Sequence, residues 1–498
     1  MKFIVLNTGE ENKIREMNTA YLVEDQWNDW FKYKTMYDLW IVDGNGKEHK
    51  IGKVKIGQED MAENQIRPNL PNEFEQLEDN FFALGQSDYY YEKIKEMGRD
   101  TRVQILNNLN DIAFDKDIYE KYKNKNVTSG SLMRSIASRT VTGQFRRIAN
   151  GGARLTNYSF KYHSYVNDGL NIAPMELFFY VKPESNPPTN IHVLIGRNGV
   201  GKTYLITNMI NSIVNNDQND SYGNFITDDD IEEIFSKVVF VSFSAFDKSI
   251  NIEDPIIPYI KIGLPHNDSS SDVNRYKLLT SNFVKSLRAC LSGIKKDLLI
   301  RVINILESDP IFKEAGIIEY CDEDNFNKDE VSDLFEKLSS GHKKIILTVT
   351  ELVQKVEEKT LVFLDEPEGH LHPPLLSAFI RALSELLINR NGLAIIATHS
   401  PVVLQEVPKS CVWKMRRKGP IAKAERLQIE SFGENITSLT TEVFGLEVTD
   451  SGFHNLLEKA VKKYGDYNDI LNKFHGELGL EAKSILKTLL ALNDEGEY

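Results

Sequence analysis

A glycine-rich segment, VLIGRNGVGKTYL, combines the residue types that bind nucleotide phosphates and a metal ion. It fits the pattern G-x-x-x-x-G-K-[ST]. The loop residues with candidate roles are Gly196, Asn198, Gly199, Gly201, Lys202 and Thr203. The glycines let backbone N–H groups turn toward phosphates, Lys202 can reach the β and γ phosphates, and the Thr203 hydroxyl can bind Mg²⁺. Because a strand-like run, 191–195, precedes the loop and a helical run follows it, we predict binding of ATP or GTP.

A pair of carboxylates, Asp365 and Glu366, follows an apolar run, 361–364, in TLVFLDEPEGHLHP. Such a run predicts a buried strand. A carboxylate at the end of this strand can hold Mg²⁺, directly or through water, and we assign that role to Asp365. Glu366 can then polarise the attacking water as a general base. In LAIIATHSP, His399 also follows a buried run, 393–397, which makes it a candidate contact to the γ-phosphate.

A third segment, KLSSGHKKIILTVTELVQK, places two serines and a glycine directly before a helical pattern. The apolar residues of one helix face are Ile345, Ile346, Val349, Leu352 and Val353. Either Ser339 or Ser340 then begins the helix. Its first turn exposes unpaired N–H groups and the positive end of the helix dipole, so the segment predicts an anion site.

Composition narrows the class of protein. The chain has 498 residues and a formal net charge of −14, so it does not coat nucleic acid as a whole; any contact needs a local basic patch. Its three cysteines show no C-x-x-C spacing, which indicates reduced thiols, no zinc site and a cytoplasmic location. The apolar start MKFIV is too short for a signal peptide, and no run reaches the length of a membrane span.

One local basic segment does stand out. Between 121 and 161 the chain has nine basic residues and no Asp or Glu. They are Lys121, Lys123, Lys125, Arg134, Arg139, Arg146, Arg147, Arg154 and Lys161. One interpretation is a solvated face paired with acidic loops elsewhere. The alternatives are contact with the backbone of DNA or RNA and contact with nucleotide phosphates.

Four motifs in order, GRNGVGKT, LSSGH, LDEPE and THSP, make the stretch from about Arg154 to Gly445 resemble the ABC-type ATPases. It resembles most the soluble branch that includes SMC, recombination and OLD-family (overcoming lysogenization defect) proteins. DEPEGHLHP and FGENITSLTTEVFG resemble OLD-family and anti-phage ATPases more than transporter subunits. The resemblance implies ATP hydrolysis with Mg²⁺. It also implies an α/β fold, with a parallel phosphate-loop sheet, an antiparallel β portion and an α-helical signature subdomain.

The resemblance gives LSSGH the role of the signature motif. Ser340 and Gly341 stand at its Ser-Gly positions, and His342 stands where the family often has Gln. In that family the signature helix closes on the γ-phosphate held by a second copy. This implies a homodimer that sandwiches two ATPs head to tail, or a higher homo-oligomer.

The sequence departs from the family pattern in one place and leaves other roles open. VVFVSFSAFDKS offers no Gln after its strand, and Ser244 or Asp247 could stand in. His370 and His372 are close in sequence, but we interpret them as shaping the loop after Glu366 rather than as metal ligands. The adenine ring could stack on one of three aromatic residues, namely Tyr158, Phe160 and Tyr162.

We expect three parts along the chain: an α+β N-terminal extension, 1–150; an ABC-type ATPase domain, 151–445; and a helical tail, 446–498. A helical insertion should occupy about 220–340 of the ATPase domain. In the extension, residues 43–46 predict a β-hairpin turn. Helical spacing in PNEFEQLEDNFFALG predicts a helix from the positions of Phe74, Leu77, Phe81 and Leu84.

Three functions fit an ATPase domain of this type. A transporter ATPase would need a membrane partner and a signature closer to LSGGQ, and a repair or SMC-like ATPase would carry a long heptad coiled coil, although compact members lack it. The third is a sensor or scaffold in bacterial anti-phage defence, similar to the Septu-system (PtuA-like) ATPase. Only 99 residues follow His399 and they contain no Asp-x-Asp, so we expect no Toprim nuclease in this chain and a separate HNH or Toprim effector. We expect no membrane contact.

Overall fold

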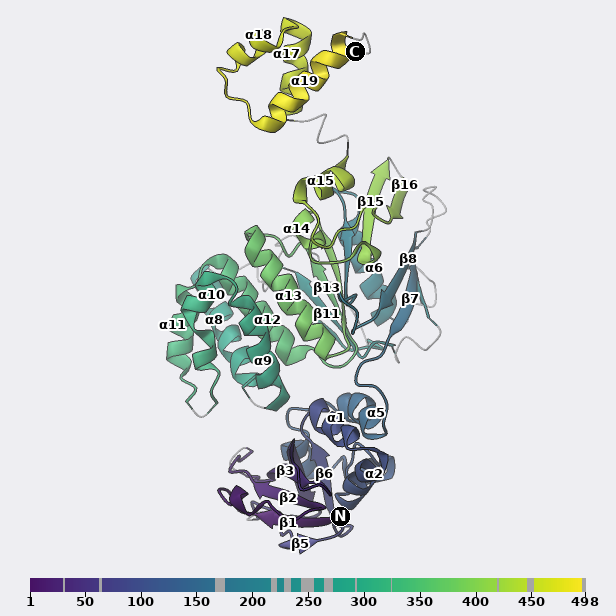
Figure 1. Cartoon of the computed structure of the whole chain (residues 1–498), viewed down its shortest axis with the longest axis vertical. Coiled ribbons are helices and arrows are strands. Elements are labelled where there is room, and N and C mark those ends of the chain that lie inside the picture. The colour runs from purple at the N-terminus through teal and green to yellow at the C-terminus, as the bar shows by residue number, and fades with distance from the viewer. Residues whose placement is uncertain are drawn as a thin grey trace.

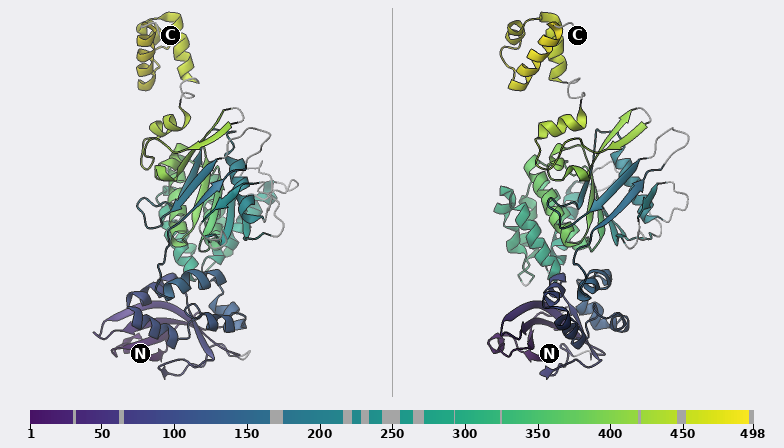
Figure 2. Two further views of the ribbon diagram at one scale, coloured as in Figure 1. Left: turned by 90° about the vertical axis from the view of Figure 1, so that its right-hand side faces the viewer. Right: turned by 45° about the vertical axis from the view of Figure 1, so that its right-hand side comes forward.

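The computed structural model describes residues 1–29, 32–61, 65–165, 175–215, 222–227, 234–242, 255–263, 272–291, 293–323, 325–418, 421–445 and 452–494. Figures 1 and 2 show three units along an elongated molecule. We call them the N-terminal unit (2–149), the head (158–444) and the tail (453–494). The N-terminal unit and the tail lie at opposite ends of the head.

A seven-stranded sheet forms the centre of the head, in the order β12-β11-β13-β14-β9-β15-β16. The strands are β9 (Ile191–Ile195), β11 (Lys237–Ser242), β12 (Tyr259–Gly263), β13 (Thr360–Asp365), β14 (Leu393–Thr398), β15 (Val412–Lys418) and β16 (Ile421–Glu425). Neighbouring strands are parallel except β15 and β16. The predicted strands at 191–195, 361–364 and 393–397 are confirmed, because continuous apolar runs fit a sheet that is covered on both faces.

Helices and a second sheet cover the two faces. On one face, α12 (Ser340–Lys355) and α13 (Pro373–Asn389) cover alternate strand residues such as Val362 and Leu364, and α8 (Asp272–Ala289) and α9 (Gly293–Leu306) pack against these two helices. The opposite face, with Leu361 and Phe363, packs against α6 (Lys202–Val214) and a three-stranded antiparallel sheet. That small sheet has the order β10 (Asn224–Ile226), β7 (Tyr158–His163), β8 (Glu176–Val181). The head thus has the predicted α/β architecture, with a largely parallel central sheet, an antiparallel β portion and a helical part.

The helical part of the head begins later than predicted. Within the expected 220–340, the described residues first form β10, β11 and β12, and the helices are α8, α9, α10 (Pro310–Ala315) and α11 (Lys328–Lys337). The strands arise because residues 238–241 are an uninterrupted β-branched and aromatic run, buried between β12 and β13. The helix predicted to begin at Ser339 or Ser340 is confirmed: α12 begins at Ser340, with Ser339 as its N-cap.

The N-terminal unit is α+β. Its six-stranded sheet has the order β5 (Glu73–Phe74), β1 (Lys2–Leu6), β2 (Thr19–Glu24), β3 (Met36–Val42), β4 (Glu48–Gln58), β6 (Phe81–Gly85). Its helices are α1 (Asp88–Glu96), α2 (Arg99–Asn108), α3 (Lys116–Tyr122), α4 (Ser138–Thr140) and α5 (Arg146–Ala149). The predicted hairpin joins β3 and β4.

The helix predicted from Phe74 to Leu84 is wrong. β5 and β6 occupy its ends, and β6 pairs with β4. Residues 81–84 are all buried, because both faces of β6 are covered by other parts of the protein. Their helical spacing with Phe74 is therefore accidental: a short apolar run buried on both faces cannot be told from a helix by periodicity alone.

The tail forms a small helical bundle of its own. After α14 (Pro401–Leu404) and α15 (Ile436–Phe444) of the head, the chain continues as α17 (Phe453–Tyr464), α18 (Tyr467–Lys473) and α19 (Leu480–Asp494). Ala460 and Val461 pack inside this bundle, whereas Leu456 is exposed. Among the described residues, no helix has both the length and the apolar character needed to cross a membrane.

Candidate nucleotide site

Three adjacent parallel strands bring the predicted site residues to one edge of the head's sheet, which we call the carboxyl edge. Ile195 of β9 is in register with Thr398 of β14, and Ala397 is in register with Asp365 of β13. The phosphate loop, Glu366 and His399 follow directly after these positions. Ligands of open parallel sheets bind at this edge, so the sequence motifs converge where their chemistry requires.

The phosphate loop has the backbone that its glycines predict. Gly199 and Gly201 have φ values of 82° and 104°, a region open to glycine at little cost. Lys202 is buried and its Nζ donates to the carbonyl oxygens of Gly196 and Arg197, at 2.9 and 3.0 Å. Burial holds the pKa of Lys202 below its ordinary value, and the nearby Glu366 charge acts the other way. Thr203 and Asn198 are exposed at this edge.

The two carboxylates after β13 differ in exposure. Asp365 is buried, whereas the Glu366 side chain is 44% exposed. Glu366 Oε1 lies 3.9 Å from Lys202 Nζ and 3.5 Å from His399 Nδ1. Glu366 also has a φ of 45°, an uncommon conformation for a residue with a side chain and one that concentrates at functional sites. The structure therefore groups the predicted base with the predicted lysine and histidine.

Glu368 belongs to this site, although sequence reasoning missed it. Its Oε1 accepts hydrogen bonds from the Thr398 hydroxyl at 2.6 Å and from the His399 backbone N–H at 2.8 Å. The same oxygen lies 3.1 Å from His399 Nδ1. Glu368 thus fixes both the backbone and the ring of His399. The sequence signal was the second Glu of LDEPE, whose partner thirty residues later cannot be read from spacing.

The start of the signature helix is fastened to the loop after Glu366. Ser339 is the N-cap of α12, and Ser340 is its exposed first residue. A side chain on Gly341 would come within 2.8 Å of the His370 carbonyl oxygen, so this approach requires glycine. Lys344 Nζ donates to the carbonyls of Pro367 and Gly369, both at 2.9 Å, and burial lowers the pKa of Lys344 to about 8.

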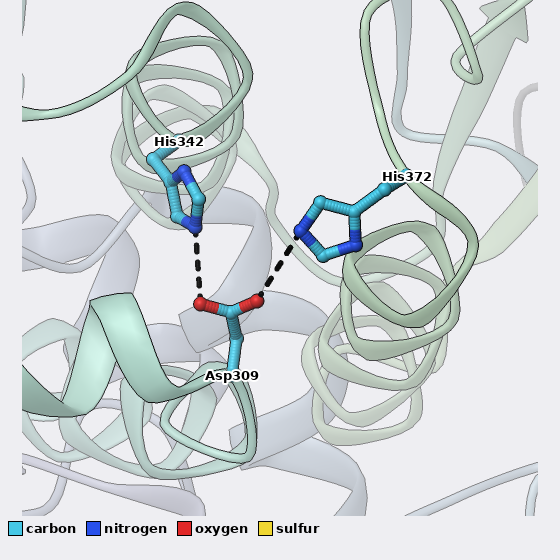
Figure 3. Close-up of side chains that lie close together, drawn as sticks. All are labelled: Asp309, His342 and His372. Carbon is cyan, nitrogen blue, oxygen red and sulfur yellow. Dashed lines mark hydrogen bonds and ion pairs between the residues drawn. The ribbon is translucent and has the colours of Figure 1, made fainter.

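Figure 3 shows two imidazoles that point from two helices at one carboxylate. His342 Nε2 lies 3.0 Å from Asp309 Oδ1, and His372 Nε2 lies 3.6 Å from Asp309 Oδ2. Burial acts to raise the pKa of Asp309, but hydrogen bonds from His342 and two backbone N–H groups hold it below its ordinary value. This carboxylate is the partner of His372 that sequence spacing could not show.

The hydrogen bonds of Asp309, His342 and His372 indicate whether these residues form a metal site. The three donor atoms lie within 4.8 Å of one another, as a His₂Asp metal site would need. However, His372 Nδ1 accepts the Leu375 N–H at 3.3 Å, so the neutral ring carries its proton on Nε2, the atom that faces Asp309 at 3.6 Å. His342 has the matching arrangement, with Nδ1 2.6 Å from the Ser339 hydroxyl. We therefore interpret Asp309 and His342 as a hydrogen-bond chain that holds Ser339, with the His372 ring beside the carboxylate.

The basic segment 121–161 is paired inside the chain. Lys125 binds Glu59 at 2.8 Å, Arg147 binds Glu358 at 2.6 Å, and Lys161 binds Glu176 at 2.8 Å. The other six bind carboxylates or backbone carbonyls: Lys121, Lys123, Arg134, Arg139, Arg146 and Arg154. Several of these acids, such as Glu59 and Glu358, come from distant segments that the sequence could not place, whereas Glu120 is only three residues from Lys123. The structure therefore favours the paired interpretation over the predicted contact with DNA or RNA.

Burial also narrows the choice among the three aromatic residues proposed to stack on adenine. Phe160 and Tyr162 are buried in the core between β7 and α6, so their rings are not available to stack on adenine. Tyr158 is partly buried and donates its hydroxyl to the Asn391 carbonyl. Ser244 and Asp247, the candidates for the missing Gln, lie outside the described residues.

Comparison with known proteins assigns the family. The chain is 37% identical over 526 residues to Protein ea59 of Escherichia phage lambda, an alignment that covers all of this chain and 99% of that protein. The chain belongs to the ea59 family. Residues 265–405 also match the family described as "AAA domain, putative AbiEii toxin, Type IV TA system", which includes the signature helix, Glu366 and His399 of this ea59-family chain.

Solved structures resemble this ea59-family chain only in part. An ATP-binding cassette of an ABC transporter aligns with 59% of this chain and 98% of its own, at a TM-score of 0.32 and 12% identity. UvrA2 from Deinococcus radiodurans aligns with 53% of this chain and 36% of its own, at a TM-score of 0.29 and 13% identity. These TM-scores are too low to support an inference about function.

Proposed function

We propose that this chain binds and hydrolyses ATP with Mg²⁺, and that two copies close head to tail around two ATP molecules. The observation that carries the proposal is the convergence of three side chains at the carboxyl edge. Lys202 Nζ and His399 Nδ1 both lie within 4 Å of Glu366 Oε1. The loop glycines already have the backbone that turns N–H groups toward phosphates. The buried Asp365 and the exposed Thr203 offer the oxygens that Mg²⁺ prefers.

Each residue at this edge has a separate task. Lys202 exchanges its bonds to loop carbonyls for bonds to the phosphates, which relieves a charge that burial disfavours. Glu366 orients and deprotonates the attacking water, and His399, held by Glu368, donates to the γ-phosphate oxygen. Mg²⁺, held by Thr203 and Asp365, would neutralise the charge that develops on the phosphates.

The signature helix supports action in a dimer. Ser340 is exposed at the start of α12, where the helix dipole favours an anion. Lys344, Gly341 and His342 all contact the segment that follows Glu366, directly or through Asp309. A change at Glu366 on hydrolysis therefore has a short covalent and hydrogen-bonded route to the serine that serves the facing copy.

Mixing two inactive variants tests this proposal. Lys202→Ala removes the phosphate contact, and Ser340→Arg blocks closure on the partner's nucleotide while the isolated protomer keeps ATP binding. In a mixed dimer one composite site carries both changes and the other carries neither. Random pairing at equal concentrations should restore about a quarter of wild-type ATPase activity. A mixture that stays inactive, although heterodimers are detected by mass, contradicts action between copies.

We also propose that the chain is a sensor or scaffold for a separate effector nuclease in anti-phage defence. Two units support this because the nucleotide site does not use them: the N-terminal unit, and the tail with its exposed Phe453 and Leu456. Purified full-length protein with Mg²⁺ should not cut DNA or RNA. Cleavage that is lost on mutation of an acidic residue outside the ATP site would contradict a separate effector.

A further inference from the structure

A cavity of about 290 Å³ lies where the N-terminal unit meets the head. Residues 133–137 and Thr140 line it from the N-terminal unit, and Lys295, Val356 and Arg390 line it from the head. Figure 1 shows this junction below α9, and direct contacts hold it, such as Arg147 to Glu358 at 2.6 Å and Arg301 to the Tyr89 hydroxyl at 3.0 Å. The cavity is therefore part of a formed interface between two units.

Two of the cations that line this cavity have no ion pair among the residues that the structure describes. Arg390 is only 8% exposed, and its Nε has no hydrogen-bond partner. Within the described part of the chain, neither Lys295 nor Arg390 forms an ion pair. Burial lowers the pKa of both groups. A buried cation without a partner is costly, and proteins retain few of them unless something compensates the charge.

The acidic residues around Arg390 are already bound to other cations. Glu357, which also lines the cavity, binds Lys237 at 2.5 Å. Glu358 binds Arg147 at 2.6 Å, and Asp88 binds Arg154 at 3.3 Å. Arg134 lines the cavity too, and it binds Asp29 at 3.0 Å. Among the described cations that line the cavity, Lys295 and Arg390 are thus the two without an ion pair.

We propose that this cavity binds a small phosphate monoester. A monoester carries about −1.5 to −2 charges near neutral pH, which matches the two uncompensated cations. Arg390 can give a phosphate two parallel N–H donors and Lys295 a point charge. The volume is close to the roughly 300 Å³ lower limit of small-molecule sites, and Met133, Ile136 and Val356 provide an apolar wall for the organic part.

The cavity lies at the opposite edge of the sheet from the ATP site. α12 begins at the signature serine and ends just before Val356, and α13 begins after His372 and ends just before Arg390. At 1.5 Å per residue, the two helices separate the sites by about 25 Å. The monoester site is therefore distinct from the phosphate loop, and it does not depend on the proposed ATPase activity.

Calorimetric titration in saturating ADP and Mg²⁺, which occupies the phosphate loop, tests the site with AMP, inorganic phosphate and adenosine. We expect AMP to bind and adenosine not to bind, because the phosphate is the recognised group. Binding of inorganic phosphate as tight as that of AMP would identify the free ion as the ligand instead of an organic monoester. Equal binding of AMP and adenosine, or no saturable binding by AMP, overturns the proposal.

Lys295→Met adds a readout that a purely structural role would not give. Without ligand the variant should melt at a higher temperature than wild type, because it removes an uncompensated charge. Its affinity for AMP should fall about tenfold or more. Lys296→Met is the matched control, since Lys296 is next on the same helix, binds Asp322 at 3.9 Å and does not line the cavity.

Arg390→Gln provides a second variant, with the same expected loss of AMP affinity. The proposal fails if Lys295→Met and Arg390→Gln both bind AMP as tightly as wild type does. It also fails if Lys296→Met loses as much affinity as they do. The melting temperatures of all three variants show whether each remains folded under the conditions of the titration.

Discussion

At the carboxyl edge of the head's sheet the charged groups lie close to opposite charges. At the opposite edge, which we call the amino edge because Val356 and Arg390 precede β13 and β14, two cations have no ion pair among the described residues. Lys202 lies 3.9 Å from Glu366, and His399 lies 3.1 Å from Glu368, so each charge at the first edge has an opposite charge close by. At the second edge, Lys295 and Arg390 face a cavity while the neighbouring acids bind other cations.

This difference teaches how each edge is prepared for its ligand. The carboxyl edge keeps its lysine and base in mutual contact, so an incoming phosphate exchanges one set of partners for another. At the other edge the nearby acids Glu357 and Glu358 are held by Lys237 and Arg147, so an incoming anion has no ion pair of Lys295 or Arg390 to displace. We therefore expect loss of the Glu366 charge to impair ATP hydrolysis at the first edge, and loss of the Lys295 charge to stabilise the second edge in the absence of ligand.

The largest expected effect is on ATP turnover and concerns Glu366, the proposed base of the carboxyl edge. Glu366→Gln should lower ATP turnover about 100-fold or more, because the amide cannot accept the proton of the attacking water. It should keep ATP bound and trap the closed dimer. Retained nucleotide and mass by light scattering measure both outcomes, with Glu477→Gln, an exposed tail position, as the control. Turnover equal to wild type would remove Glu366 from the role of base.

The sequence predicted the carboxyl edge because its residues lie within contiguous motifs at strand ends. The phosphate loop, Asp365, Glu366 and His399 each directly follow an apolar run, and parallel strands align their carboxyl ends. The strands and the signature helix follow from the same runs. Glu368 was not predicted, because it lies next to its partners, Thr398 and His399, only in the folded sheet.

The amino edge could not be predicted in this way. Lys295 lies in α9, Val356 directly follows α12 and Arg390 directly follows α13, and nothing in their spacing brings them together. The paired state of the basic segment was equally hidden, because Arg147 finds its partner, Glu358, more than two hundred residues later. The false helix at Phe74–Leu84 had a local cause: a short buried strand and a helix face share the same apolar pattern.

A smaller effect would sharpen the account of the carboxyl edge. Glu368→Gln should lower ATP turnover about tenfold, because Glu368 positions His399 and does not touch the nucleotide in our proposal. ATP affinity should change little. The double variant Glu368→Gln/His399→Gln separates positioning from other roles, since it should be no slower than His399→Gln alone. A further loss in the double variant would show that Glu368 acts independently of His399.

The smallest effect concerns Lys344, the one carboxyl-edge cation whose pKa of about 8 falls within an accessible pH range. Burial favours its neutral form, so between about pH 8 and 10.5 the unfolded chain binds the proton that the folded chain has released. The free energy of unfolding should therefore rise with pH across this window, by roughly 1–2 kcal/mol after allowance for solvent screening, and the contribution should be flat below pH 8.

Lys344→Met removes this dependence and identifies its source. Urea unfolding at pH 7, 8, 9 and 10 should give wild-type stability that rises relative to the variant only above pH 8. Lys343→Met is the matched control, because Lys343 is adjacent on α12 and binds only the exposed Glu336 carbonyl, at 2.9 Å. If wild type and Lys344→Met run parallel over the whole range, the cost of burying Lys344 is already offset by the Pro367 and Gly369 carbonyls. The charge of every described cation at the carboxyl edge that we discuss would then be compensated by its contacts. The difference between this edge and the unpaired Lys295 and Arg390 would be larger than we infer.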